Sequence, residues 1–282
     1  MNSDTRPSPG SPYLPVGVFD SGVGGLTVLR ALCAVLPAES FIYLGDTARL
    51  PYGTKSEHTV ARYALQAADE LVERGIKCLV VACNTASAAA LPALQQRFSE
   101  VPVIGVIEPG ARAACAATRS GRIAVLATES TVRGGAYTQA IARIRADAEV
   151  TTIACALFVA LAEEGWTEGP VASAAAERYL NPLRVANAHP VDTIVLGCTH
   201  FPVLKSVIGA AAGVGVRLVD SAATTAQEVR QLLAERGLQR TPGGTPPRFS
   251  FLATDAVDRF AEVGGRFFGA PIAADEVELI DL

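Results

Sequence analysis

Lysine and histidine are scarce in this sequence. Of its 24 basic residues only three are lysines, and only three histidines occur in 282 residues. The 28 acidic residues give a formal net charge of -4, and the arginines are scattered along the chain rather than gathered in a stripe. This charge balance argues against nucleic acid as the primary ligand. Three histidines without the spacing of metal ligands argue against a metal site as well.

Export signals and long apolar runs are also missing. The first ten residues, MNSDTRPSPG, lack the apolar core of a signal peptide, and no apolar run approaches the about 18 residues of a membrane span. We therefore expect a cytoplasmic protein that does not interact with membranes. The six cysteines include no Cys-x-x-Cys pair, and in a chain of this size without an export signal we expect reduced thiols rather than disulfides.

What the sequence does contain is an alternation of short apolar runs and helical patterns from Val16 onward. A chain of this length suggests about two domains. Strands that are apolar throughout, alternating with helices, predict parallel sheets covered on both faces. The predicted fold class is therefore α/β, with two doubly wound parallel-sheet lobes. The expected strands are 16–20, 40–46, 76–83, 101–107, 122–128, 150–158, 192–198 and 215–220, and a last strand-and-helix unit is expected from Arg248 onward.

Polar residues gather at the ends of these predicted strands. In open α/β sheets, ligands bind beyond the carboxyl ends of the strands. One polar strand end is ordinary, but six in one chain indicate a site shared between two facing lobes. They are Asp20-Ser21, Asp46-Thr47, Cys83-Asn84-Thr85, Thr128, Cys198-Thr199-His200 and Asp220-Ser221.

Two of these strand ends are copies of one unit. Both LVVACNTASAAAL (79–91) and TIVLGCTHFPVL (193–204) read as a strand, a small residue, a cysteine, polar residues and the start of a helix. A thiol near a helix N-terminus is expected to have a lowered pKa, because the helix amides favour the anion. The alternative is that Cys83 and Cys198 are small core residues, which is the interpretation we adopt for the other four cysteines.

Two thiols that face each other across a pocket suit the inversion of a carbon acid. One thiolate removes a proton from one face, the opposite thiol delivers a proton to the other face, and each turnover exchanges their protonation states. Asp20 and His200 are candidates to tune these thiols, one in each lobe. His58 and His189 are expected to be surface groups.

The glycine-rich stretch DSGVGGL (20–26) is a weak match to a dinucleotide-binding motif, because it reads Gly-x-Gly-Gly. It is either a tight strand-to-helix turn or a place where Ser21 and the helix amides bind part of an anionic substrate, and we favour the second interpretation. A pyridoxal enzyme needs a Schiff-base lysine. Lys77 precedes a strand and Lys205 lies in a predicted helix, while Lys55 lies in a loop near the candidates. We expect no cofactor.

The sequence resembles the glutamate racemase branch of the aspartate/glutamate racemase superfamily. The resemblance runs from Val16 to about Phe268, and the blocks appear in the family's order, which makes the match specific. They are FDSGVGGLTVLRAL, YLGDTARLPYGTKS, VVACNTASAAAL, VPVIGVIEPG, AVLATESTV, ALFVALAEEG, VLGCTHFPVL and LVDSA. In two places the chain departs from the usual pattern, with Ala156 and Ala160 where prolines are common and Gly135 where serine is common.

The resemblance implies a cofactor-independent racemase that interconverts L- and D-glutamate and supplies D-glutamate for peptidoglycan. It implies that Cys83 acts on D-glutamate and Cys198 on L-glutamate, with Asp20 beside the first cysteine and His200 and Glu163 beside the second. The substrate contacts that it implies are Asp20, Ser21, Tyr52, Gly53, Asn84, Thr85, Thr199 and His200. Aspartate racemases typically carry an acidic residue at the position of His200. A racemase of aspartate and a non-catalytic regulatory member remain the alternatives.

Residues 1–15 are rich in Pro, Ser and Gly, and we expect them to form a mobile tail. The resemblance implies a first lobe formed by 16–107 and 221–282, and a second lobe, 108–220, inserted into the first. The active site is expected in the cleft between the two lobes, and the protein is expected to form a homodimer.

Overall fold

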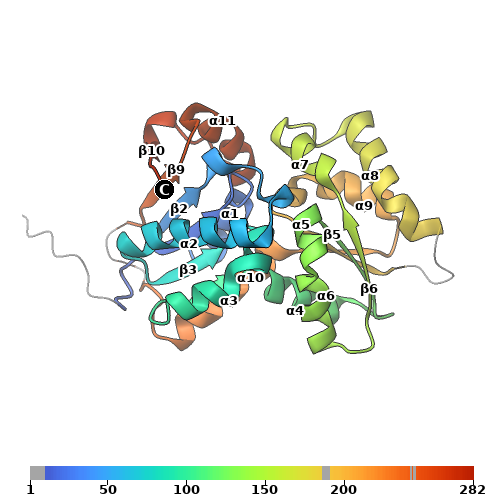
Figure 1. Cartoon of the computed structure of the whole chain (residues 1–282), viewed down its shortest axis with the longest axis horizontal. Coiled ribbons are helices and arrows are strands. Elements are labelled where there is room, and N and C mark those ends of the chain that lie inside the picture. Colours follow the sequence, from blue (N-terminus) through green and yellow to red (C-terminus); the bar gives the residue numbers. More distant parts are fainter. Residues whose placement is uncertain (1–9, 186–190, 242, 244–245) are drawn as a thin grey trace, which may run out of the picture.

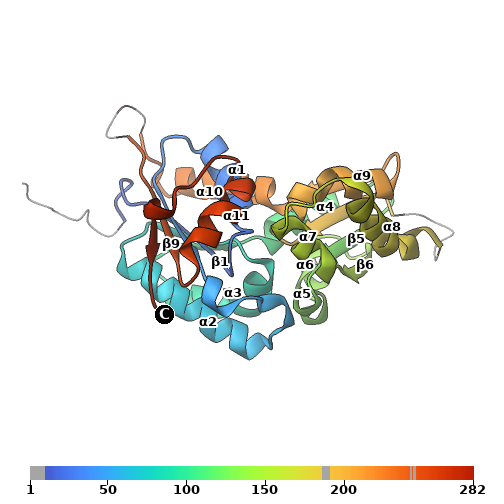
Figure 2. The ribbon, with the colours of Figure 1, turned by 90° about the horizontal axis from the view of Figure 1, so that it is seen from above.

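Two parallel β-sheets lie side by side, each in its own α/β lobe (Figures 1 and 2). The computed structural model describes residues 10–185, 191–241, 243 and 246–282. The first sheet has six strands in the order β10-β9-β2-β1-β3-β4, and the second has four in the order β6-β5-β7-β8. The described strand pairs are parallel in both sheets. The predicted fold class is confirmed.

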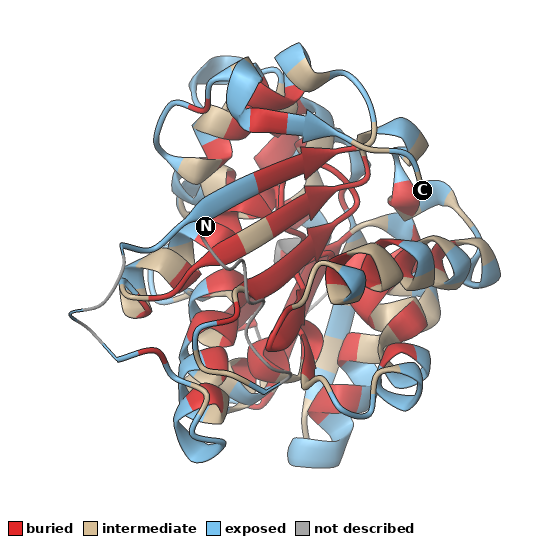
Figure 3. Ribbon diagram, turned by 90° about the vertical axis from the view of Figure 1, so that its left-hand side faces the viewer, coloured by how far each residue is buried: buried red, intermediate tan, exposed pale blue. Residues whose placement is uncertain are grey.

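The first sheet is built from both ends of the chain. Its central strand β1 is buried at every position, as expected for an apolar strand covered on both faces. In Figure 3 the strands of this sheet are mostly coloured as buried, with helices on either side. The strands are β1 (Val16–Asp20), β2 (Phe41–Gly45), β3 (Cys78–Val81), β4 (Val103–Gly105), β9 (Phe249–Ala253) and β10 (Val277–Leu279).

The second sheet consists of β5 (Arg122–Ala127), β6 (Glu149–Ala154), β7 (Thr193–Gly197) and β8 (Arg217–Asp220). One predicted strand, 150–158, was wrong over its last residues, because the chain is helical from Ala156 in helix α7 (Ala156–Glu163). β6 ends beside the end of β5, where the Cys155 amide donates to the Ala127 carbonyl over 2.9 Å. The run that follows is apolar throughout, and such a run does not distinguish a strand from a buried helix.

Helices cover both sheets, and α2 shows how the sequence specifies one of them. The Ser56 hydroxyl caps its start by accepting a hydrogen bond from the Thr59 amide over 3.3 Å. Its buried residues repeat at helical spacing and form one apolar stripe. They are Val60, Ala64, Ala67, Ala68 and Leu71.

The longer helices are α1 (Leu26–Val35), α2 (Glu57–Glu73), α3 (Asn84–Arg97), α4 (Ile107–Ala117), α8 (Gly169–Val185), α10 (Ser221–Glu235) and α11 (Val257–Phe268). The shorter ones are α5 (Glu129–Gly134), α6 (Ala136–Ile144) and α9 (Lys205–Ala212), with 3-10 turns at Thr47–Arg49, Tyr52–Thr54, Phe201–Leu204 and Ala274–Glu276.

A buried ion pair ties the start of the described chain to the first sheet. The ammonium of Lys77 contacts the Glu39 carboxylate and donates to the carbonyls of Pro12 and Leu238 over 2.6 and 2.9 Å. Leu14 is buried as well. Residues 1–9 of the expected tail lie outside the described residues, as does His189.

The two lobes contact each other through α10, which packs against both α1 and α4. The strands of the first sheet come from residues 16–105 and 249–279, and those of the second from residues 122–220. Within the described part of the chain, no helix is both long and apolar enough to cross a membrane.

Candidate active site

The strand ends of both sheets open into one cavity of about 380 Å³. Segments that follow β1, β3, β5 and β7 line it, so each lobe contributes residues to the same space. Of the residues predicted from the sequence, those lining it are Ser21, Tyr52, Gly53, Cys83, Asn84, Thr85, Thr128, Glu163, Cys198, Thr199 and His200. Ala156 and Ala160, which stand where prolines are common in the family, lie in α7 and line the same cavity.

Cys83 occupies the start of α3 as its N-cap residue. Its sulfur accepts a hydrogen bond from the Ala86 amide over 3.4 Å, and its thiol donates to the Ser21 hydroxyl over 3.4 Å. The expectation of a lowered pKa is wrong for this thiol. Burial and the nearby charge of Asp20 raise the pKa of Cys83 to about 12, outweighing the helix amide and the hydroxyl.

Asp20 lies behind the cavity at the end of β1 and is completely buried. Its Oδ2 accepts a hydrogen bond from the Gly22 amide over 3.0 Å, whereas its Oδ1 has no hydrogen-bond partner among the described residues. Burial raises the pKa of this carboxyl above its ordinary value, and the His200 charge and the backbone amides of the turn oppose the shift. In the folded protein the ionised form of Asp20 is therefore destabilised relative to the neutral carboxyl.

The glycines of the turn after β1 allow the two lobes to approach closely. A Cβ atom at Gly24 would lie only 2.5 Å from the imidazole of His200 and from the hydroxyl of Thr199. A Cβ atom at Gly25 would lie 2.5 Å from the Cβ of Asp20. Thr27, at the start of α1, donates to the Thr199 carbonyl over 3.0 Å. The glycine-rich motif therefore permits tight packing against the second cysteine segment.

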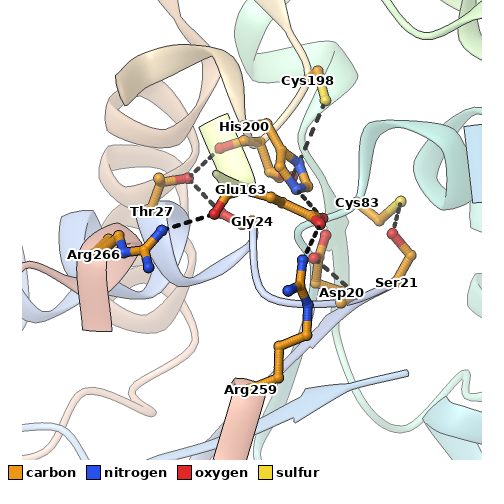
Figure 4. A network of polar contacts seen from close by, with 12 residues as sticks. Asp20, Ser21, Gly24, Thr27, Cys83, Glu163, Cys198, His200, Arg259 and Arg266 are labelled. Carbon is orange, nitrogen blue, oxygen red and sulfur yellow. Dashed lines mark hydrogen bonds and ion pairs between the residues drawn. The ribbon is translucent and has the colours of Figure 1, made fainter. Parts of the chain in front are cut away.

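His200 connects Cys198 to Glu163 (Figure 4). Its Nδ1 lies 3.8 Å from the Cys198 sulfur, and its Nε2 lies 3.1 Å from Oε1 of Glu163. Burial opposes a charge on the imidazole, but the contacts with Cys198 and Glu163, together with the charges of Cys198 and Asp20, raise the pKa of His200 to about 10. The hydrogen bond from His200 in turn lowers the pKa of Glu163. A pKa of about 10 makes His200 cationic at neutral pH, with its Nδ1 facing the Cys198 sulfur.

Hydroxyl groups from both lobes meet on another wall of the cavity. Thr85, at the start of α3, lies 3.0 Å from Thr128 and 3.2 Å from Thr131, measured between hydroxyl oxygens. Thr128 and Thr131 are themselves 3.0 Å apart. Sequence reasoning noted Thr128 as a polar strand end but did not name Thr131, which has no strand-end signal because it lies inside α5.

Asn84 is oriented by a residue that the sequence did not indicate. The Tyr137 hydroxyl, from α6 in the second lobe, donates to Oδ1 of Asn84 over 2.7 Å. The amide nitrogen of Asn84 is buried and has no hydrogen-bond partner among the described residues. Asn84 lines the cavity, so an unpaired amide donor belongs to the cavity wall.

Tyr52 is held in the cavity wall by Asp46, at the end of β2. The Tyr52 hydroxyl donates to Oδ2 of Asp46, and Arg49 contacts the same oxygen over 2.7 Å. Thr254 donates to Oδ1 of Asp46 over 3.0 Å, so both oxygens of this carboxylate have hydrogen-bond partners. A Cβ atom at Gly53 would lie 2.9 Å from Thr128, which explains a glycine where the two lobes touch.

The residues of the site offer little that could hold a metal or a pyridoxal group. Among the described residues, no group of three or more His, Cys, Asp and Glu side chains is placed to bind a metal ion. The described lining of the cavity includes no lysine. Lys77 is committed to its buried pair with Glu39. His58 is exposed, in agreement with the sequence prediction.

Comparison with known proteins gives one family. A model of the Asp/Glu/Hydantoin racemase family matches residues 22–229. A glutamate racemase of Geobacter metallireducens is 55% identical, over 93% of this chain and 95% of the relative. Crystal structures of glutamate racemases from Bacillus anthracis and from Francisella tularensis, the latter with D-glutamate, are 36% and 34% identical, with TM-scores of 0.89 and 0.88. Each comparison covers 96% of this chain and 98% of the other. The chain therefore belongs to the Asp/Glu/Hydantoin racemase family, in its glutamate racemase branch.

Proposed function

We propose that this chain interconverts L- and D-glutamate by proton transfer at the α-carbon between Cys83 and Cys198, without a cofactor. One observation carries the proposal. The two thiols follow strands of different sheets, β3 and β7, and line the same cavity from the two lobes. The α-carbon can lose its proton to the thiolate on one face, and the planar carbanion that results can gain a proton from the thiol on the other face.

The two thiols have different electrostatic surroundings, which suits them to opposite roles in one turnover. Cys83 holds its proton, because burial and Asp20 raise its pKa to about 12. Cys198 lies 3.8 Å from His200, whose pKa is raised to about 10. In either direction one thiol acts as the base and the other as the acid, and the roles are exchanged after each turnover. By the stereochemistry that the family implies, Cys198 takes the proton of L-glutamate and Cys83 that of D-glutamate.

The cavity offers the donors that two carboxylates need. The residues in its wall that carry hydroxyl or amide groups include Ser21, Asn84, Thr85, Thr128 and Thr199, and the hydroxyls of Thr85 and Thr128 are 3.0 Å apart. Hydroxyl and amide donors bind carboxylates while the α-carbon stays exposed to the thiols. Asp20, Tyr52 and Gly53 complete the proposed substrate contacts, and the relative from Francisella tularensis was solved with D-glutamate.

His200 and Glu163 are proposed to assist Cys198, and Asp20 to assist Cys83. Glu163 accepts from Nε2 of His200 and so fixes which ring nitrogen faces the sulfur. Asp20 is also placed to attract the ammonium group of the substrate. The position of His200 favours glutamate over aspartate, since aspartate racemases typically carry an acidic residue there.

Three further proposals rest on the family and on the sequence. The protein supplies D-glutamate for peptidoglycan in the cytoplasm, and it acts as a homodimer. The chain divides into a tail over residues 1–15, a first lobe over 16–107 and 221–282, and an inserted lobe over 108–220. The division is supported by the sheets, because the strands of the first come from residues 16–105 and 249–279 and those of the second from residues 122–220.

Circular dichroism of the purified protein tests the function directly. With a metal chelator present and no pyridoxal phosphate, we expect the optical signal of L-glutamate to decay to zero, and that of L-aspartate to decay far more slowly. A faster loss of the aspartate signal would identify an aspartate racemase. No loss of either signal would indicate a non-catalytic member, and activity that disappears with chelation and returns with metal would contradict cofactor independence.

A further inference from the structure

Helix α11 reaches from the first sheet's lobe to the Cys198 side of the cavity. Two of its arginines contact Glu163 at the end of α7 (Figure 4), and a phenylalanine contacts the imidazole of His200. Arg259 contacts the Glu163 carboxylate, Arg266 donates to the Glu163 carbonyl over 2.8 Å, and the ring of Phe267 packs edge-on to His200 at 5.1 Å between centroids.

The Glu163 carboxylate divides its two oxygens between partners from different segments. Oε1 lies 3.1 Å from Nε2 of His200, and Oε2 lies 3.4 Å from Nη2 of Arg259. Glu163 is mostly buried, with 21% of its side chain exposed, whereas 59% of the Arg259 side chain is exposed. A carboxylate with a charged donor on each oxygen has less rotational freedom than one with a single partner.

We propose that Arg259 is a positioning residue for proton transfer at Cys198. By fixing Oε2 of Glu163, it keeps Oε1 aimed at Nε2 of His200, and this leaves Nδ1 facing the Cys198 sulfur. The inference deepens the proposed function and rests on it, because it assigns to one thiol a helper from the opposite lobe. Arg259 touches neither sulfur among the described contacts, and it acts through Glu163 and His200.

The hydrogen-bonded contacts of Arg259 lead to Cys198 and not to Cys83, so its effect should fall mainly on one face of the substrate. The described hydrogen bonds of Cys83 run to Ser21 and to the Ala86 amide, and neither partner is bonded to Glu163. Loss of Arg259 should therefore slow the chemistry at Cys198 and leave the chemistry at Cys83 nearly unchanged. Merely loosening the packing between the lobes would affect both thiols.

An elimination reaction separates the two faces. The probe is 3-chloroglutamate, offered as its L and its D form. The thiolate takes the α-proton, the C–H electron pair forms the double bond between Cα and Cβ, and chloride leaves with the electrons of the C–Cl bond. The enamine product tautomerises and is hydrolysed to a keto acid and ammonia. Only one thiol is needed, so Cys83→Ser reports on Cys198 alone and Cys198→Ser on Cys83 alone.

Arg259→Gln is introduced into both single-cysteine backgrounds, with Arg259→Lys as the conservative variant. Arg266→Gln is the matched control, because Arg266 lies on the same helix and contacts the backbone of Glu163 rather than its carboxylate. When only Cys198 remains, we expect Arg259→Gln to lower kcat for elimination about fivefold, because an exposed ion pair contributes only a modest free energy. KM should change little, and so should the reaction at Cys83. Arg259→Lys should restore part of the lost rate. Arg266→Gln should change the elimination rate by the same factor in both single-cysteine backgrounds.

Three results would overturn the inference. Equal slowing at both thiols would mean that α11 only holds the lobes together. An unchanged rate at Cys198 would mean that Arg259 is a surface ion pair without consequence for the reaction. A protein with the native sequence that neither racemises glutamate nor eliminates chloride would overturn the proposed function itself, and the inference with it, whereas the first two results leave the proposed function intact.

Discussion

Asp20 is buried directly behind Cys83, and its negative charge is one reason why the pKa of this thiol rises to about 12. The opposite thiol, Cys198, has the cationic His200 as its neighbour. The two cysteine segments are therefore alike in sequence and different in electrostatics. A racemase needs an acid on one face of the α-carbon and a base on the other, and the two thiols proposed for these roles have unequal neighbours, a buried carboxyl at Cys83 and an imidazole at Cys198.

The cost of burying Asp20 predicts a more stable but less active Asp20→Asn variant. The pKa of Asp20 is higher in the folded protein than its unfolded value near 3.8. The neutral carboxyl therefore contributes fully to stability below that unfolded pKa, and this contribution is lost as the pH rises through the folded pKa. At pH 7 we expect the variant to gain roughly 1–3 kcal/mol in the free energy of unfolding, because a neutral amide is cheaper to bury than a charge. Its turnover should fall, as expected where function and stability conflict.

Denaturant unfolding at pH 4 and pH 7 provides the measurement. The difference in stability between Asp20→Asn and the native sequence should nearly vanish at the lower pH. Equal stabilities at pH 7 would show that the charge of Asp20 is not costly in the folded protein. Ser21→Ala serves as a control, since it removes a neighbouring polar group without removing a charge.

Replacement of His200 by asparagine should lower turnover without abolishing glutamate binding. The imidazole links Cys198 to Glu163, and positioned proton-transfer groups are typically worth about 10²–10⁴-fold in rate. Steady-state racemisation and calorimetric binding of glutamate measure the two effects separately. His58→Asn is a suitable control, because this histidine is exposed on α2. Unchanged turnover across the pH range would reduce His200 to a structural neighbour.

Tyr137 is expected to act on substrate affinity through Asn84. Its hydroxyl donates to Oδ1 of Asn84 over 2.7 Å and so directs the unpaired amide nitrogen. In Tyr137→Phe the amide is free to turn, and we expect KM for glutamate to rise about three- to tenfold, the value of one hydrogen bond. The value of kcat should change less. A loss confined to kcat would contradict a role in binding.

The sequence predicted the strands, the lobes and the cysteine segments because these depend on local pattern. Apolar strands, glycines in turns and polar strand ends are readable one segment at a time. Tyr137 and Arg259 were not predicted, since each lies in an ordinary helix and acquires its contact only when the two lobes come together. The pKa of Cys83 was mispredicted for the same reason. The helix start was visible in the sequence, whereas the degree of burial and the nearness of Asp20 were not.

The two thiols can be tested separately by the variants Cys83→Ser and Cys198→Ser. Each should stop racemisation, because a hydroxyl is far too weak a base at neutral pH and both faces of the α-carbon must be served. Each variant nevertheless keeps one thiol that can remove a proton from the enantiomer whose C–H bond points toward it. Glutamate with a leaving group on its β-carbon needs only that one step, since the group departs after deprotonation.

Each variant should therefore eliminate from a single enantiomer of the analogue, and the two variants should show opposite preferences. By the stereochemistry that the family implies, Cys198→Ser retains the reaction of the D form at Cys83, and Cys83→Ser retains that of the L form at Cys198. Cys115→Ser is the control, because Cys115 is a thiol of α4 outside the lining of the cavity, and it should process both forms. If both single variants consumed the same enantiomer, the thiols could not serve opposite faces, and one of them would be a core residue that happens to line the cavity.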